Sequence, residues 1–314
     1  MADVAEVTII GGGPIGLFGY YCAGLNRRSV QLLERLDRVG GQLEHLYPEK
    51  PIYDVGGYPK ITGHDLVEQL KQQAFQYDGR VRTGIVAQQL DPLHEGYRIH
   101  TNRGLYESPV VIVTAGIGEF IPRRMNIPAI DQYEGRGLYY VVNQLSDFDN
   151  QRVLVVGGGD SAADWALAIA DRAKSVTMIH RREGFQCHAD SLIKLRSHGS
   201  VSLIPLRALR AVVGTHAVEA VLLQEASGTP LEEPLEVDRI IVAIGLIPGT
   251  QLFTEWGLTM AGNEILVATD MSTNRPGVYA AGDIAKYPGK VKLMAAGFGE
   301  VATAVEAACR YLDS

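Results

Sequence analysis

The chain of 314 residues contains only three cysteines, Cys22, Cys187 and Cys309, and they lie far apart in the sequence. No pair has the C-x-x-C spacing, so the sequence offers neither a disulfide framework nor a cluster of thiolate metal ligands. Cys22 and Cys309 lie in apolar helical stretches, and we expect both to be buried as small hydrophobic side chains. We therefore expect no metal site and no dithiol chemistry.

Long apolar runs and excess positive charge are lacking as well. No run approaches the roughly 20 apolar residues of a membrane span, and residues 1–6 lack the basic start of a signal peptide. We expect a cytoplasmic protein with no membrane partner. The net charge of −7 argues against general nucleic-acid binding. Local basic groups, such as Lys286, Lys290 and Lys292, are compatible with an acidic protein partner.

Glycine is plentiful, with 35 residues, and two glycine-rich loops share one pattern. Each loop follows a short apolar run and precedes a helical segment. Its first glycine permits a tight turn, the second lets the backbone approach a pyrophosphate, and the third lets the helix pack against the strand, where alanine is also permitted. The helix N-terminus then binds the phosphates. The first loop contains Gly11, Gly13, Pro14 and Gly16, and the second contains Gly157, Gly159, Asp160, Ser161 and Ala162.

The residues that end the next apolar run distinguish two dinucleotides. Glu34 follows the first loop, and an acid at this place accepts hydrogen bonds from free ribose hydroxyls. His180, Arg181 and Arg182 follow the second loop, and the arginines suit a 2′-phosphate. We therefore predict FAD in the first loop and NADPH in the second. The alternative is two ordinary turns with solvated charges at the strand ends.

The apolar pattern predicts an α/β fold with two Rossmann-like, three-layer domains. The runs 110–116 and 240–245 both end in glycine and indicate crossovers between the domains. The NADPH-binding domain, 119–244, is then inserted into a discontinuous FAD-binding domain, 1–118 and 245–314. Residues 40–61 are expected to form an extended loop. Strands are expected at 7–10, 30–33, 81–86, 97–101, 110–114, 153–156, 176–180 and 239–243, and helices at 14–26, 62–77, 160–173, 189–198 and 294–312.

A Gly-Asp pair ends a further strand-like run at 277–283. In a flavin-binding domain Asp283 can hydrogen-bond the ribityl chain, which also supports the discontinuous domain. The alternative role for Asp283 is that of an ordinary turn residue.

Several motifs together resemble the low-molecular-weight thioredoxin reductases over nearly the whole chain. They are the two glycine loops, Gly40-Gly41-Gln42, His180-Arg181-Arg182 and the run that ends in Gly282-Asp283. Those reductases carry C-x-x-C shortly before the second glycine loop, whereas residues 137–144 here contain no sulfur. A dithiol relay requires a thiolate nucleophile, so thioredoxin reduction is not expected.

A sister group fits better. Residues 47–55, 57–59, 123–124, 137–140, 158–167, 287–290 and 297–300 resemble the thioredoxin-reductase-like ferredoxin–NADP⁺ reductases. The resemblance implies a homodimeric FAD enzyme that passes electrons between NADPH and ferredoxin or flavodoxin. Hydride would pass to flavin N5 and electrons would leave singly, so no catalytic acid or base is required.

The same resemblance assigns residues to the flavin. It implies Gly41 and Gln42 near the flavin ring, Tyr47 within the cofactor site and Tyr53 near the isoalloxazine, where an aromatic ring can stack at an offset. The alternative for Tyr53 is a loop aromatic that belongs to the core.

Two departures keep other functions open. Family members commonly have an arginine where this chain has Gln186, which would soften the preference for NADPH over NADH. Many members also carry a C-terminal extension that covers the flavin, whereas this chain stops at Ser314. An alternative function is therefore an NAD(P)H oxidoreductase acting on quinone, free flavin or another small acceptor. A third possibility is a flavoprotein sensor without turnover.

Overall fold

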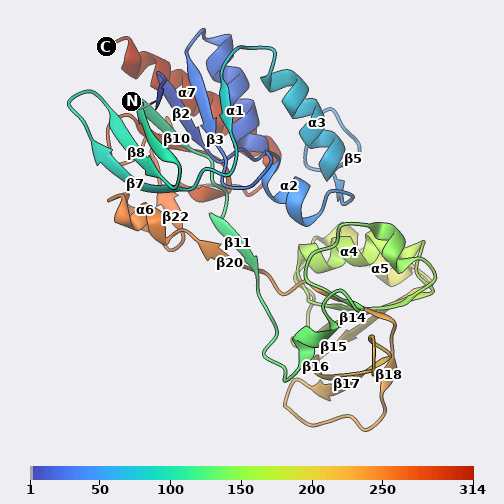
Figure 1. The fold of residues 1–314 in the computed structure, drawn as a ribbon. Helices are drawn as coiled ribbons and strands as arrows, with labels where there is room; N and C mark the ends of the chain where they lie inside the picture. Colours follow the sequence, from blue (N-terminus) through green and yellow to red (C-terminus); the bar gives the residue numbers. More distant parts are fainter. Residues whose placement is uncertain (1–2) are drawn as a thin grey trace. The chain divides into compact units, whose positions relative to one another are not determined.

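The computed structural model describes residues 3–314 and divides into two units (Figure 1). The first comprises Met1–Pro48 (described from Asp3), Ile52–Phe120 and Pro248–Ser314, and the second comprises Glu49–Pro51 and Ile121–Ile247. Two strands, β11 (Glu119–Pro122) and β20 (Leu246–Gly249), pair where the chain crosses between the units. Gly118 and Gly245, the expected ends of the crossovers, immediately precede these two strands.

The first unit is built on a five-stranded sheet in the order β23-β10-β2-β3-β6, whose neighbouring strands are all parallel. Its central strands are short apolar runs that are buried on both faces, as parallel strands between two layers must be. The strands are β2 (Val7–Ile10), β3 (Val30–Leu33), β6 (Arg80–Arg82), β10 (Val110–Val113) and β23 (Val278–Ala280).

Helices cover one face of this sheet and a second sheet covers the other (Figure 1). Val7 and Ile9 belong to the core under the helices, whereas Ile10 belongs to the core under the second sheet. The second sheet has the order β1-β9-β8-β7. Its strands are β1 (Asp3–Val4), β7 (Ala87–Pro92), β8 (Tyr97–Thr101) and β9 (Gly104–Ser108), and the helices are α1 (Pro14–Leu25), α3 (Gly63–Ala74) and α7 (Met294–Leu312).

Local signals explain where these helices begin. Pro14 occupies the first turn of α1, where its missing N–H is not needed. The side chain of Thr62 accepts a hydrogen bond from the N–H of Asp65 at 3.1 Å and caps α3. The smaller elements of this unit are α6 (Gln251–Glu255), β21 (Met260–Ala261), β22 (Glu264–Leu266), β24 (Ala285–Lys286) and a 3₁₀ turn at Gly282–Ile284.

The second unit repeats the architecture of the first. Its parallel sheet has the order β12-β19-β13-β14-β15, with α4 and α5 on one side and the antiparallel strands β16, β17 and β18 on the other (Figure 1). The elements are β12 (Leu138–Tyr139), β13 (Arg152–Val156), α4 (Asp160–Ala170), β14 (Ser175–His180), α5 (Ala189–Ser197), β15 (Val201–Pro205), β16 (Arg207–Val213), β17 (Ala220–Glu225), β18 (Leu235–Glu236) and β19 (Arg239–Val242).

The expectation of an extended loop at 40–61 is wrong. This segment contains the helix α2 (Gly41–Leu46) and the short strands β4 (Pro51–Ile52) and β5 (Ile61–Thr62). Gly40 and Gly41 have φ angles of 117° and 55°, which turn the chain into α2. Leu43 is buried in the core beside Val67, and this tertiary contact stabilises a helix too short to form alone.

The strand predicted at 81–86 is also wrong in extent. β6 ends at Arg82 and β7 begins at Ala87. Gly84, with a φ of 66°, lies between them, and its N–H donates to the Leu36 carbonyl at 2.7 Å. The chain therefore leaves one sheet and enters another within a run that has a single apolar pattern.

Candidate dinucleotide-binding sites

In the first glycine loop, neighbouring backbone atoms leave no room for a side chain at Gly11 or Gly16. A methyl group at Gly11, whose φ is 107°, would lie 2.7 Å from the Thr114 carbonyl oxygen, and one at Gly16 would lie 1.9 Å from the Gly11 carbonyl oxygen. The Thr114 hydroxyl donates to that same Gly11 carbonyl at 2.8 Å. At Gly13 the nearest atom to such a methyl group is Gly41 Cα at 3.9 Å, so of these loop glycines only Gly13 has room for a side chain. The loop thus presents bare backbone beside Gly13 at the N-terminus of α1.

Glu34 binds the loop directly. The N–H of Gly12 donates to Glu34 Oε2 at 2.6 Å, and the N–H of Leu36 donates to Oε1 at 2.8 Å. Burial raises the pKa of the Glu34 carboxyl above its ordinary value, and the N–H donors of Leu36 and Gly12 oppose that rise. A carboxylate has about four lone-pair sites, and the backbone N–H of Arg35 is a third donor to this one. Acceptor capacity therefore remains for a ribose hydroxyl.

Helix α2 brings further predicted residues to this loop. Gly41 lies against Gly13, and the Gln42 amide nitrogen lies 3.4 Å from the Cβ position of Gly116. Tyr47 follows α2 and is half-buried against the core under the helices. The structure therefore places Gln42 between the first glycine loop and the end of β10, whereas Tyr47 lies at the far end of α2.

Tyr53 and Asp283 occupy exposed turns of the first unit. The Tyr53 side chain is 62% exposed, and the next residue, Asp54, accepts a hydrogen bond from the N–H of Met294 at the start of α7 at 2.8 Å. Asp283 is exposed, and the preceding Gly282 packs against Ile15 in the first turn of α1. The Asp283 turn is thus adjacent to the glycine loop.

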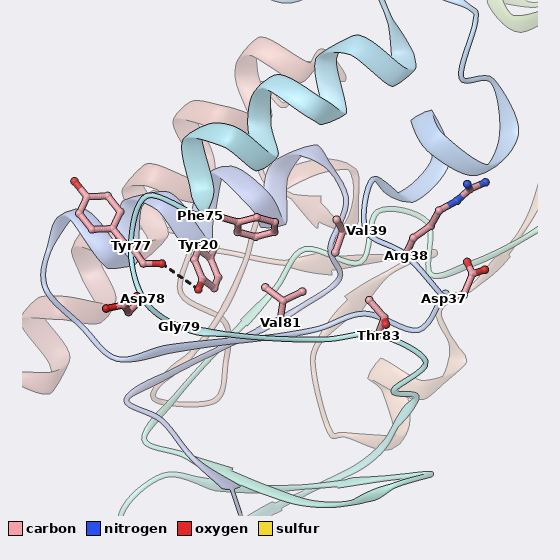
Figure 2. A pocket seen from close by; sticks show the side chains of 10 residues that line it. All are labelled: Tyr20, Asp37, Arg38, Val39, Phe75, Tyr77, Asp78, Gly79, Val81 and Thr83. Atoms are coloured by element: carbon pink, nitrogen blue, oxygen red, sulfur yellow. Dashed lines mark hydrogen bonds between the residues drawn. The ribbon is translucent and has the colours of Figure 1, made fainter.

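A pocket of about 540 Å³ lies on the helix side of the first sheet (Figure 2). Figure 2 shows the rings of Tyr20 and Phe75 at one end and Arg38 at the other. Val39 lines the pocket and also lies beside Gly12, because a methyl group at Gly12 would be 3.0 Å from Val39 Cγ1. The pocket therefore adjoins the loop where the adenosine half of FAD is expected.

The second glycine loop has the same construction. A methyl group at Gly157 would lie 2.3 Å from the Ala243 carbonyl oxygen, while at Gly159 the nearest atom is 4.0 Å away. Gly159 therefore has room for a methyl group at the N-terminus of α4, beside Gln186, and Asp160 and Ser161 follow it in the first turn. Ala162, in the third glycine place, is fully buried.

His180 packs directly on this loop. A methyl group at Gly158 would lie 2.3 Å from His180 Cγ, so only glycine admits the ring. Burial lowers the pKa of the His180 imidazole, and the charges of Arg182 and Arg181 lower it further. Its Nε2 atom is buried and has no hydrogen-bond partner among the described residues. A neutral imidazole with a free ring nitrogen fits a ligand that supplies a polar group at this place.

The two predicted arginines are exposed at the end of β14. Arg182 Nη1 donates to Gln186 Oε1 at 3.1 Å, and the N–H of Gln186 donates to the Gly158 carbonyl at 2.6 Å. Asp160 Oδ1 accepts from the N–H of His188 at 2.8 Å. The segment after the arginines is therefore fastened to the glycine loop at two points.

The three lysines of the candidate basic patch all form ion pairs. Lys286 and Lys292 both pair with Glu264, at 3.6 and 2.7 Å, and Lys290 is buried in an ion pair with Glu300. Only Lys290 is withdrawn from the surface, because Lys286 and Lys292 stay about half exposed and share one carboxylate, which leaves one net positive charge there.

Two further site classes, membrane-spanning helices and metal-binding clusters, are absent from the described part of the chain. Residues 3–314 contain no helix that is long and apolar enough to cross a membrane. Within the same range no group of three or more His, Cys, Asp and Glu side chains is placed to hold a metal ion. Cys22 and Cys309 are buried, as predicted, and Cys187 is half-buried.

The fold and the two glycine loops place the protein in the class of α/β proteins with two Rossmann-like domains, one inserted into the other. The family model of the pyridine nucleotide-disulphide oxidoreductases matches residues 44–282. A ferredoxin–NADP reductase of Geobacillus kaustophilus is 43% identical over 99% of this chain and 94% of the relative. A ferredoxin–NADP reductase 2 of Listeria innocua is 41% identical with the same coverage.

Solved structures agree on the fold. A thioredoxin reductase of Lactococcus lactis superposes with a TM-score of 0.85 at 24% identity, covering 98% of this chain and 99% of that one. A thioredoxin reductase of T. acidophilum gives 0.84 at 25% identity, covering 99% of each chain. The chain belongs to the pyridine nucleotide-disulphide oxidoreductases and, within them, to the thioredoxin-reductase-like ferredoxin–NADP reductases. It is an oxidoreductase, and the predicted fold class and family are confirmed.

Several residues around the sites were not predicted from sequence. Thr114 and Asp54 act through backbone groups of distant segments. Asp54 lies within the motif at 47–55, yet nothing in that motif indicates its bond to the N–H of Met294. Lys290 and Glu300 lie within motifs that carried the family resemblance, yet their spacing gives no sign that they pair. Strand ends adjacent to a glycine loop would have indicated Thr114, because the carboxyl ends of neighbouring parallel strands meet.

Proposed function

We propose that the protein is a ferredoxin–NADP reductase that binds FAD in its first unit and NADPH in its second. The carrying observation is the contrast between the two loops. The first has the buried carboxylate of Glu34 beside it, and the second has the neutral His180 and the exposed Arg181 and Arg182. A carboxylate selects free ribose hydroxyls and repels a phosphate, whereas arginines select a phosphate.

The first unit fits FAD through groups that remain available. Bare backbone at Gly13 would admit the pyrophosphate, and the remaining acceptor capacity of Glu34 would bind a ribose hydroxyl. Asp283 would bind the ribityl chain. Gln42 would lie near the flavin ring, and the exposed ring of Tyr53 would stack on it.

The second unit fits NADPH in the same way. Gly159 and the first turn of α4 offer open backbone N–H groups to the pyrophosphate. Arg181 and Arg182 would hold the 2′-phosphate, and the unpaired His180 Nε2 would gain a partner in the bound nucleotide. Asp160 is already engaged by the N–H of His188, so its part is to hold the loop in place.

The chain itself performs no acid–base step in this proposal. FAD, when bound, supplies an acceptor for two electrons from the nicotinamide and a donor of single electrons to an iron–sulfur protein or flavodoxin. The protein binds both nucleotides and holds them in place. Ferredoxin or flavodoxin as partner, and a homodimer, are proposed from the family membership.

A comparison of donors and acceptors tests the proposal. Purified protein should be yellow, and anaerobic NADPH should bleach the flavin absorbance. NADPH should then drive reduction of ferredoxin or flavodoxin faster than that of a quinone, and faster than NADH does. A colourless protein that takes up no added flavin would refute the proposal. Faster turnover with quinone would favour the small-acceptor alternative, and bleaching without turnover would favour a sensor.

A further inference from the structure

A buried ion pair lies directly beneath the turn that carries Asp283. Lys290 Nζ pairs with Glu300 Oε1, and the two side chains are only 2% and 4% exposed. Glu300 lies in the N-terminal part of α7, and Lys290 lies in the segment that precedes this helix. Neither group belongs to the nucleotide contacts described above.

Both members of the pair bind the same residue. The N–H of Gly282 donates to Glu300 Oε2 at 2.8 Å, and Lys290 Nζ donates to the Gly282 carbonyl at 3.1 Å. Gly282 has a φ of 80°, a conformation that favours glycine. The pair thus fixes the donor and the acceptor of one left-handed backbone position, and Asp283 is the next residue.

Tyr287 completes the cluster. Its hydroxyl donates to Glu300 Oε1 at 2.8 Å, so three donors from three places converge on one carboxylate. The neighbours of Asp283 on both sides are buried, whereas Asp283 itself is exposed. The cluster therefore determines where the Asp283 side chain leaves the protein.

General energetics argue against a purely stabilising role. A buried ion pair loses hydration on both charges, and apolar side chains of similar size often stabilise a protein as well or better. A buried ion pair can instead orient the backbone, because its negative member accepts from an N–H while its positive member donates to the carbonyl of the same residue.

We propose that Lys290 and Glu300 are positioning residues for bound FAD. They act through Gly282 and hold Asp283 where it meets the ribityl chain. The proposal rests on the proposed function, since it assumes that the first unit binds FAD.

The test is the rate of FAD release from purified, FAD-loaded protein, followed as the rise of flavin fluorescence on dilution. Lys290→Met removes the donor to the Gly282 carbonyl and should speed release about tenfold or more, since a hydrogen bond to a charged group is lost. Lys286→Met is the matched control, because Lys286 pairs with Glu264 at the surface. Its release rate should stay within about twofold of the wild type.

The double variant Lys290→Met with Glu300→Gln separates positioning from folding. It leaves no unpaired buried charge, so its melting temperature should recover relative to Lys290→Met. The glutamine side chain introduced by Glu300→Gln keeps an acceptor for the Gly282 N–H. The Gly282 carbonyl still lacks its donor, so fast FAD release should persist.

Recovery of both melting temperature and FAD release in the double variant would overturn the proposal, as would unchanged release in Lys290→Met. These outcomes leave the proposed function intact, because the wild type would still hold FAD. A wild-type protein that binds no flavin would instead refute the proposed function, and this inference with it.

Discussion

Glu34 illustrates how one side chain serves two purposes at the residue scale. Two of its lone pairs already fix the turn through the N–H groups of Gly12 and Leu36. The pattern of a glycine loop followed by an acid predicted the residue, yet it gave no sign that the acid also holds the loop. A substitution of Glu34 should therefore affect both the stability of the loop and the binding of the nucleotide.

Its titration gives a pH prediction. Burial raises the pKa of Glu34, so folding favours the protonated form. The stabilising contribution is complete below the ordinary pKa of about 4.3 and declines as the pH rises through the raised value. We expect the free energy of unfolding of flavin-free wild type, minus that of Glu34→Gln, to fall as the pH rises above about 4.3 through the raised pKa. Urea titrations measure it, and a difference that rises with pH would contradict the pKa direction.

The arginine pair gives a second prediction at this scale. Arg181→Ala with Arg182→Ala should raise KM for NADPH by on the order of 10–100-fold, because charge-assisted hydrogen bonds to a phosphate are lost. KM for NADH, which lacks the 2′-phosphate, should change little. Arg210→Ala, an exposed arginine on β16, is the control and should affect neither. Equal effects of the double substitution on both coenzymes would exclude a 2′-phosphate contact.

At the scale of elements, each glycine loop works as a unit in which the glycines have different tasks. A methyl group at Gly16 collides with the Gly11 carbonyl, whereas one at Gly13 meets nothing closer than 3.9 Å. The first contact joins α1 to the loop, whereas the second position has room for a methyl group beside Gly41. Substitutions of chemically identical residues three positions apart should therefore fail for different reasons.

Gly16→Ala should reduce the melting temperature or prevent folding, because a contact of 1.9 Å to a carbonyl oxygen forces α1 away from the loop. Gly13→Ala should fold with a melting temperature of the flavin-free protein close to wild type, yet hold far less FAD per chain. Thermal denaturation and the ratio of flavin to protein absorbance measure the two. Equal FAD content in Gly13→Ala and wild type would show that the pyrophosphate does not approach there.

The limits of sequence reasoning also appear at this scale. Helix α1 was predicted closely because the glycine loop before it and the apolar strand after it mark both of its ends, and α7 was predicted with its observed bounds. Helix α2 was missed because its two leading glycines signal a turn, and only the burial of Leu43 against the rest of the core makes it helical. The break between β6 and β7 depends on a contact between Gly84 and Leu36, which local sequence does not encode.

For the whole molecule, each candidate site draws its residues from one unit. The loop at 11–16, Glu34, Gln42 and Asp283 belong to the first unit, and the loop at 157–162 and residues 180–188 belong to the second. The predicted contacts of FAD and NADPH thus depend on separate cores, and the sequence pattern was sufficient to separate them because each loop carries its own strand-end residue.

Hydrogen exchange should show this separation. Addition of 2′,5′-ADP, which carries the phosphate and adenosine of NADPH, should slow amide exchange at 157–162 and 180–188. Exchange at 11–16 should stay the same in FAD-loaded protein. Protection confined to the first loop would contradict the assignment of the two nucleotides, and mass spectrometry of peptic peptides resolves these segments.

The pairing of β11 with β20 has a consequence for domain grafting. The chain leaves the first unit and returns to it along adjacent strands, so most of the second unit is one continuous insertion. Replacement of residues 121–247 as a block would cut the chain at two places, and it would also remove the partners of Glu49 and Lys50, which belong to the second unit and contact the N–H of Leu145 and the side chain of Asp164. A graft of the second unit that aims to change coenzyme preference must therefore carry residues 49–51 together with 121–247.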